Sequence, residues 1–262
     1  MSNFRSIVCD LDGVLYLAAE PVPGAGAALA AVAAAGADLW FVTNNSTRTP
    51  DDVAAKISLR TGYPARADQV VTSALSTAAH LRGVAASALV LGGEGLVQAL
   101  TDVGIAVVDA SEPAENEAAE VDAVVIGLDH ALSYRRLAAA TAAVRAGARL
   151  VASNIDATYP TPHGLDPGAG SMVAAVERAS GRTAEPCGKP HEPMRRFLAD
   201  RLAPGPVLVV GDRLDTDLAL GWASGWATAL VLTGVTTADE AGDPRIDMVL
   251  PSIAALPTAL GL

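Results

Sequence analysis

Cysteine and aromatic residues are scarce in this chain of 262 residues, which holds two Cys, three Trp, four Tyr and three Phe. Two cysteines, Cys9 and Cys187, cannot build a disulfide framework or a four-cysteine zinc site, so we expect buried thiols in a reducing cytoplasm. The scarcity of aromatic residues, beside abundant alanine, favours helices packed on a sheet over an aromatic-rich β fold.

Positive charge and long apolar runs are lacking as well. The chain has 18 basic and 29 acidic residues, a net charge of −11, which argues against nucleic acid or an anionic membrane as partner. The apolar run 27–35 is too short to span a bilayer. Arg5, Asp10 and Asp12 interrupt any signal-peptide core, which also favours a cytoplasmic protein. An anionic substrate would therefore need a local cationic site.

Acidic residues stand directly after two apolar stretches. Asp10 and Asp12 follow residues 6–9, and Asp212 follows residues 206–210; both stretches are typical of buried parallel strands. The carboxyl ends of such strands are where open α/β sheets bind ligands. Carboxylates gathered there need a cation to stay charged, which predicts a hard-metal site. The alternative, that the acids only cap helices, suits Asp212 alone but not all the runs together.

A third run, Gly188-Lys189-Pro190, supplies a lysine, whose positive charge suits a phosphate group. It is not a P-loop, because no Ser or Thr follows Lys189. Metal and lysine together suit a phosphate group.

The spacing of these runs predicts the domain organisation. Asp10 and Thr43 are 33 positions apart, the size of one strand–helix–strand unit, with a helix over 24–35 and a strand over 38–42. Thr43 and Lys189 are 146 positions apart, far more than the roughly 30 residues of one crossover. We therefore predict an α/β fold. Its core is a doubly wound, Rossmann-like parallel sheet (1–80 plus 186–262), and residues 81–185 form an inserted α/β domain.

The inserted stretch has its own alternation of strands and helices. Strands are predicted over 88–91, 105–108, 123–126 and 149–152, and helices over 94–103 and 134–146. In the carboxyl-terminal part of the core, a further helix is predicted over 192–202. An acidic surface linker is expected over 111–120, and a loop rich in glycine and proline over 154–171.

Four runs together resemble the motifs of the haloacid dehalogenase-like hydrolases: Asp10–Gly13 (DLDG), Val42–Ser46 (VTNNS), Gly188–Pro190 (GKP) and Gly211–Asp217 (GDRLDTD). The long insertion after Thr43 is similar to the C2-type cap, an α/β domain of one subfamily. Asn154–Asp156 (NID) and Pro167–Ser171 (PGAGS) narrow the resemblance to the 4-nitrophenylphosphatase, phosphoglycolate phosphatase and glycerol 3-phosphate phosphatase group. Val14 departs from the Thr of many relatives.

The resemblance implies an Mg²⁺-dependent phosphomonoester hydrolase that works through an aspartyl-phosphate. Asp10 is the implied nucleophile, as carboxylates can be. Asp12, two residues along an extended chain and so on the same side, is the implied acid–base group. Mg²⁺ prefers oxygen ligands, and the implied ones are Asp10, the backbone carbonyl of Asp12, and Asp212.

The remaining polar residues of these runs receive supporting roles by the same resemblance. The implied phosphate-binding groups are Thr43, the backbone N–H groups of Asn44 and Asn45, and Lys189. Asp215 and Asp217 are expected to orient water and Lys189 from behind the metal ligands, although Asp215 is equally well explained as an acid in a first helical turn. Thr43 has the alternative of capping a helix before Pro50.

The cap is expected to choose the substrate. Asn154, Asp156 and Tyr159 would approach it, although the glycines and prolines nearby could simply form turns. Without a basic cluster there, a small neutral or hydroxylated leaving group is favoured, as in glycerol 3-phosphate or phosphoglycolate. A homodimer through the cap is a further expectation. The alternatives are a phosphotransferase or phosphomutase on the same core, or a non-catalytic protein that binds a phosphometabolite.

Overall fold

The computed structural model describes residues 4–18, 20–109, 120–161 and 164–262, which form two compact units. The first comprises residues 1–43, 50–71 and 198–262, and the second comprises residues 44–49 and 72–197. The linker predicted over 111–120 lies almost wholly outside the described residues.

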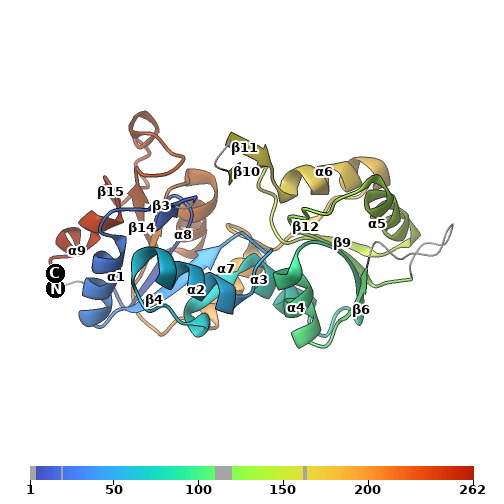
Figure 1. Ribbon diagram of the computed structural model, residues 1–262, viewed down its shortest axis with the longest axis horizontal. Helices are drawn as coiled ribbons and strands as arrows, with labels where there is room; N and C mark the ends of the chain where they lie inside the picture. Colours follow the sequence, from blue (N-terminus) through green and yellow to red (C-terminus); the bar gives the residue numbers. More distant parts are fainter. Residues whose placement is uncertain (1–3, 19, 110–119, 162–163) are drawn as a thin grey trace. The chain divides into compact units, whose positions relative to one another are not determined.

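The first unit is built on a six-stranded sheet (Figure 1). Its strands, in spatial order, are β15 (Met248–Leu250), β14 (Ala227–Val231), β13 (Val207–Gly211), β1 (Ser6–Cys9), β4 (Asp38–Thr43) and β5 (Val70–Thr72). Strand β1 is parallel to both β13 and β4, with Cys9 opposite Val210 and Phe41. The residues that follow β1 and β13 therefore reach the same edge of the sheet.

Helices cover this sheet because its strands are apolar on both faces. The helices are α1 (Ala25–Ala34), α2 (Pro50–Thr61), α8 (Ala219–Ser224) and α9 (Leu256–Ala259), and a short hairpin joins β2 (Tyr16–Leu17) to β3 (Glu20–Pro21). Leu29 of α1 and Ile57 of α2 belong to one buried cluster with Ile7 of β1. Val209 points to the opposite face, where it lies against α8 at Gly221. The predicted doubly wound α/β core is confirmed.

The second unit contains a five-stranded sheet of its own. The strand order is β12 (Glu185–Pro186), β9 (Arg149–Ala152), β8 (Ala123–Ile126), β6 (Ser87–Leu91) and β7 (Ala106–Asp109), and every pairing in it is parallel. Its helices are α3 (Ser73–Leu81), α4 (Glu94–Asp102), α5 (Tyr134–Ala146), α6 (Ala169–Ser180) and α7 (Glu192–Ala199), of which α7 runs on into the first unit.

Alternation along β6 divides the helices of the second unit between two faces. Val90 packs with residues of α3 and α4, whereas Leu89 packs with residues of α5 and α6. In Figure 1, α4 lies below this sheet and α5 and α6 lie above it. The predicted inserted α/β layer structure is present.

The loop predicted over 154–171 is wrong from residue 158 onward. Thr158–Thr161 (β10) and Gly164–Pro167 (β11) form an antiparallel hairpin, and α6 already begins at Ala169. A loop was predicted because glycine and proline are frequent in this segment. The hairpin forms because Thr158 and Tyr159 favour extended backbone and pair with Pro167 and Asp166.

The other predicted strands and helices are present, with ends shifted by a few residues. Strands 6–9, 123–126 and 149–152 and helix 134–146 have the predicted bounds, whereas helix 192–202 ends earlier, at Ala199. The predicted domain bounds remain a prediction. Within the described residues no helix is both long enough and apolar enough to cross a membrane.

Candidate active site

Three carboxylates meet at the carboxyl edge of the first unit's sheet. Asp10, Asp212 and Asp217 each place an oxygen so that the three lie within 4.8 Å of one another. Asp10 follows β1 and its backbone N–H donates to the Val210 carbonyl at 2.9 Å, which continues the ladder between β1 and β13. Asp212 follows β13 directly. The strand pairing therefore brings together side chains that lie some two hundred positions apart in the sequence.

The segment after β14 holds the Asp212 carboxylate. The backbone N–H of Val235 donates to Asp212 Oδ2 at 2.7 Å, and the Thr236 N–H donates to the Asp212 carbonyl at 3.1 Å. Gly234 makes the approach possible, because a Cβ there would lie 1.9 Å from Asp212 Oδ2. Gly13, with φ of +90°, leaves room on another side, where a Cβ would lie 2.5 Å from the same oxygen.

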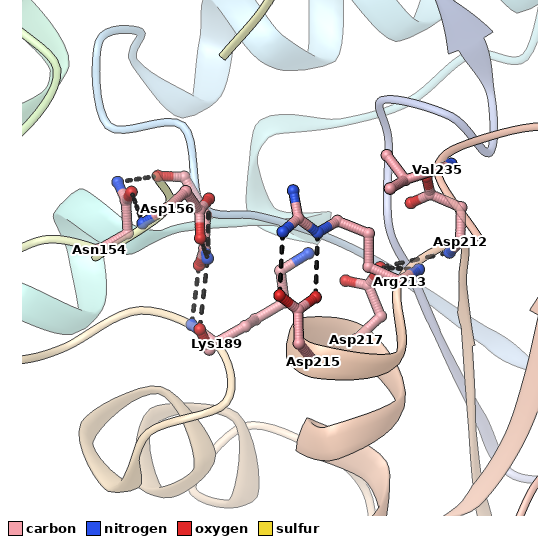
Figure 2. A network of polar contacts seen from close by, with 9 residues as sticks. Asn154, Asp156, Lys189, Asp212, Arg213, Asp215, Asp217 and Val235 are labelled. Carbon is pink, nitrogen blue, oxygen red and sulfur yellow. Dashed lines mark hydrogen bonds and ion pairs between the residues drawn. The ribbon is translucent and has the colours of Figure 1, made fainter. Parts of the chain in front are cut away.

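Asp217 lies in a turn of helix (Leu214–Leu218) and is 1% exposed. Its Oδ2 accepts the backbone N–H groups of Asp212 at 3.3 Å and Arg213 at 3.2 Å, as Figure 2 shows. The carboxylate thus belongs to the acidic cluster itself and also fixes the backbone of Asp212. Its predicted place behind the metal ligands remains a prediction.

Asp215 is placed differently from Asp217. Arg213 donates to both carboxylate oxygens of Asp215, at 3.1 Å from Nε and at 3.0 Å from the terminal nitrogen. The Asp215 side chain is 68% exposed. These hydrogen bonds from Arg213 lower the pKa of the Asp215 carboxyl. The placement favours the simpler of the two predicted explanations, an acid in a first helical turn.

The Asp12 side chain does not join the acidic cluster. Its Oδ1 lies 3.6 Å from Nζ of Lys56 on α2, and its backbone bridges to Tyr16 at the start of β2. The carboxylate cluster consists of side-chain oxygens, so the role of the Asp12 backbone carbonyl as a metal ligand remains a prediction. Asp10 and Asp12 therefore present their carboxylates to different surroundings.

The acidic cluster fits a divalent metal ion. Its donors are carboxylate oxygens alone, and the clustered atoms are close enough to share one ion. Hard cations such as Mg²⁺ prefer oxygen donors, and a bound cation would offset the mutual repulsion of three carboxylates this close. The glycines at 13 and 234 keep the space beside Asp212 clear of side chains.

In the second unit, Asn44 is the centre of a hydrogen-bond network. Its partners Asn154, Asp156 and Lys189 are labelled in Figure 2. Its Nδ2 donates to the Asp156 carboxylate at 3.1 and 3.2 Å and to the Lys189 carbonyl at 3.3 Å. Its Oδ1 accepts the Lys189 backbone N–H at 2.7 Å. Asn154 Nδ2 donates to the Asn44 carbonyl at 2.8 Å, and Asn154 Oδ1 accepts the Asp156 N–H at 3.2 Å.

This network gives two of the predicted cap residues a structural role. The side chains of Asn154 and Asp156 are engaged with Asn44, so each has a structural task besides any contact with substrate. Lys189 is 4% exposed, and its peptide group is held at both the N–H and the carbonyl. The network fixes where the lysine leaves the backbone.

Thr43 and Asn45 flank Asn44. Thr43 ends β4 and is buried. The Asn45 side chain closes a local turn, since its Oδ1 accepts from the N–H and the hydroxyl of Thr47 at 2.9 and 2.7 Å. The predicted phosphate contacts of Asn44 and Asn45 use backbone N–H groups, which these side-chain bonds do not occupy.

Tyr159, on β10, lines a cavity of about 350 Å³ in the second unit. The ring of His130 meets it edge-on with centroids 6.3 Å apart, and Leu128, Met172 and Asp166 also line the cavity. Of the three predicted cap residues, Tyr159 lines this cavity, and Asn154 and Asp156 do not. His130 was not predicted as a site residue, because no spacing in the sequence links it to Tyr159.

The chain matches two family models in the regions that carry these residues. The model described as haloacid dehalogenase-like hydrolase matches residues 7–106, and one described as HAD-hydrolase-like matches residues 186–256. Together with the fold and the acidic cluster, these matches show that the chain belongs to the haloacid dehalogenase-like hydrolases.

Similar proteins narrow the class. An acid sugar phosphatase of Staphylococcus haemolyticus is 38% identical over 92% of this chain and 89% of its own length. Among solved structures, a hypothetical protein of Pyrococcus horikoshii has a TM-score of 0.92 at 36% identity, covering 98% of this chain and all of its own. A glycerol phosphate phosphatase of Mycobacterium tuberculosis, solved with magnesium, has a TM-score of 0.87 at 36% identity, covering 98% of this chain and 78% of that one.

This chain is accordingly a phosphatase of the subfamily that carries the C2-type cap. Its family uses a divalent metal, for which the acidic cluster is suited.

Proposed function

We propose that this phosphatase hydrolyses small phosphorylated polyols or sugars with Mg²⁺ as cofactor, through an aspartyl-phosphate on Asp10. The observation that carries the proposal is the cluster of Asp10, Asp212 and Asp217 at one sheet edge. The names of the similar proteins, an acid sugar phosphatase and a glycerol phosphate phosphatase, support the substrate class.

The chemistry proceeds in two displacements at phosphorus. In the first, an Asp10 oxygen forms a bond to phosphorus, the bond to the ester oxygen breaks, and Asp12 gives its proton to that leaving oxygen. In the second, Asp12 takes a proton from water, the water oxygen bonds to phosphorus, and the bond to Asp10 breaks. Inorganic phosphate leaves and Asp12 is protonated again for the next cycle.

Mg²⁺ would be held by Asp10, Asp212 and the Asp12 backbone carbonyl, with Asp217 beside them. When bound, the ion supplies positive charge that offsets the repulsion between the phosphate and the attacking carboxylate. Asp212 is oriented for this task by the Val235 N–H, which occupies its Oδ2.

Phosphoryl oxygens would be bound by Thr43, by the backbone N–H groups of Asn44 and Asn45, and by the Lys189 ammonium. The buried, doubly anchored peptide of Lys189 supports this role, because a fixed origin limits where the side chain can reach. Tyr159 is the best-placed of the predicted cap residues to contact a leaving group, since it lines a cavity.

The test is a panel of phosphomonoesters, ranked by kcat/KM, with release of inorganic phosphate as the signal. Glycerol 3-phosphate and hexose phosphates should rank above nucleotides, and EDTA should abolish turnover until Mg²⁺ is restored. Phosphate release without any added alcohol acceptor distinguishes a hydrolase from a phosphotransferase. Full turnover in EDTA would refute the metal assignment, and binding without turnover would favour a non-catalytic protein.

A further inference from the structure

Lys56 lies beside the proposed acid–base group, outside every run that the sequence singled out. Its Nζ is 3.6 Å from Asp12 Oδ1 and 4.0 Å from the centre of the Tyr16 ring. Within the described residues, it is the one basic side chain at ion-pair distance from Asp12.

The Lys56 side chain is 41% exposed, and on its protein side the ammonium contacts a buried ring. Tyr16 is 1% exposed, so its ring is a rigid surface against which the Lys56 cation rests. Helix α2 is anchored by buried Val53 and Ile57, the second of which is adjacent to Lys56 in the sequence. The Asp12 backbone is fixed as well, through its bridge to Tyr16. Asp12 and its neighbouring cation thus share one support, the Tyr16 residue.

Composition makes this lysine unusual. The chain uses arginine throughout and contains only two lysines, Lys56 and Lys189. An arginine would present a planar fork able to bind both oxygens of a carboxylate, whereas an ammonium is a compact charge that can face one oxygen. The contact of Lys56 is of the second kind, since Oδ1 is the oxygen that it faces.

We infer that Lys56 is a positioning residue that holds Asp12 for proton transfer, an inference that rests on the acid–base role proposed for Asp12. The positive charge of Lys56 faces Oδ1 and disfavours a proton on that oxygen, so the Asp12 oxygen that faces Lys56 is not the one that carries the transferable proton. Oδ2 is then the oxygen that gives a proton to the leaving group and takes one from water. Tyr16 acts one step behind, by holding the ammonium over its ring.

The test compares two substrates whose leaving groups differ in their need for a proton. Glycerol 3-phosphate leaves as a poor alkoxide, and 4-nitrophenyl phosphate leaves as a stable phenolate. Lys56→Met keeps the approximate length of the side chain and its packing on Tyr16 but removes the positive charge that faces Asp12. Its kcat/KM, which reports the steps up to formation of the aspartyl-phosphate, should fall about 10-fold on glycerol 3-phosphate and less than about 3-fold on 4-nitrophenyl phosphate.

Two matched variants accompany it. Lys56→Arg retains the positive charge and should recover part of the lost rate on glycerol 3-phosphate, but not all of it, because its planar fork can also engage Oδ2. Arg60→Met removes a positive charge from the same helix without a contact to Asp12, and should leave the ratio of the two rates as in the wild type. Thermal unfolding of each variant shows whether it is folded, and the ratio of rates is read only on folded protein.

Asp12→Asn, measured with the same two substrates, distinguishes the role of Lys56 from the acid–base role of Asp12 on which it rests. If Asp12→Asn discriminates between the substrates and Lys56→Met does not, the role of Lys56 is overturned and the proposed function stands. Equal losses of kcat/KM on both substrates in Asp12→Asn would overturn the role of Asp12 as acid toward the leaving group, and the role of Lys56 with it. A shared preference for the better leaving group in both variants is the expected result.

Discussion

The Lys189 backbone N–H donates to Asn44 Oδ1 at 2.7 Å, across 145 positions of sequence. The other end of the same carboxamide donates to both oxygens of Asp156. One amide therefore joins the lysine predicted to bind phosphate to a carboxylate predicted to contact substrate. Asn44, expected to act only through its backbone, is a structural connection between them.

We expect Asn44→Ala to lower the free energy of unfolding by about 1.5–3 kcal/mol, because it leaves the Asp156 carboxylate and the Lys189 N–H without these partners. Turnover should fall together with stability. Asn44→Asp should be worse, since two carboxylates would face each other. Adding Asp156→Asn should recover part of that loss, and a double-mutant cycle by urea unfolding measures the recovery. Strict additivity would contradict the pairing.

Gly234→Ala should weaken Mg²⁺ binding about 10–100-fold, because the new methyl would displace the Asp212 carboxylate from its Val235 N–H. Gly242→Ala is the matched control, since a Cβ there meets nothing within 4 Å. Mn²⁺ titration of the metal-free protein, followed by electron paramagnetic resonance, measures affinity without relying on activity. Equal affinities in both variants would show that the segment after β14 does not orient Asp212.

The Glu185–Arg149 pair predicts a defined pH dependence of stability. Hydrogen bonds from Arg149 hold the pKa of the Glu185 carboxyl below its usual 4.5 in the folded state. A lowered folded-state pKa adds stability that is present above 4.5 and lost as the pH falls through the lowered value.

Glu185→Gln should therefore lower Tm at pH 7 and cease to do so in acid. Asp239→Asn removes a charge from an exposed site and should have little effect at either pH. Melting curves between pH 3 and 7 test this directly. A Tm difference for Glu185→Gln that persists unchanged at the acid end would contradict an ionic origin.

The two cysteines should be unreactive in the folded protein. Both are buried and neither forms a disulfide in the described part of the chain, and burial raises the pKa of the Cys187 thiol to about 12, so almost none of it is thiolate at pH 8. Ellman's reagent should titrate close to no thiols in native buffer and two in urea. Rapid labelling of the native protein would show that the strands bearing them open readily.

Much of this structure could be predicted because its signals are local. Asp10 and Asp212 follow apolar strands that the sequence predicts, and the structure pairs those two strands side by side. The hairpin of β10 and β11 could not be predicted in the same way, because its pairing was hidden among turn-forming residues.

The contacts that complete the site depend on packing between distant segments. Lys56 faces Asp12 only because α2 is packed beside the β2–β3 hairpin, and no motif marks that position. Val235 reaches Asp212 through its backbone, so its side chain leaves no signature. The glycine before it was the one available signal, and a lone glycine after a strand is equally well explained by a turn.

The central claim, that Asp10 carries the phosphoryl group, can be tested by trapping it. Asp12→Asn keeps the nucleophile but slows the attack of water, so the phosphorylated form should accumulate with 4-nitrophenyl phosphate, whose leaving group needs no proton. Borohydride reduces an aspartyl-phosphate to homoserine, and peptide mass spectrometry locates the change. We predict homoserine at position 10, dependent on substrate and Mg²⁺ and absent from the additional Asp10→Asn variant. Turnover with no modification, or modification at another residue, would contradict the account.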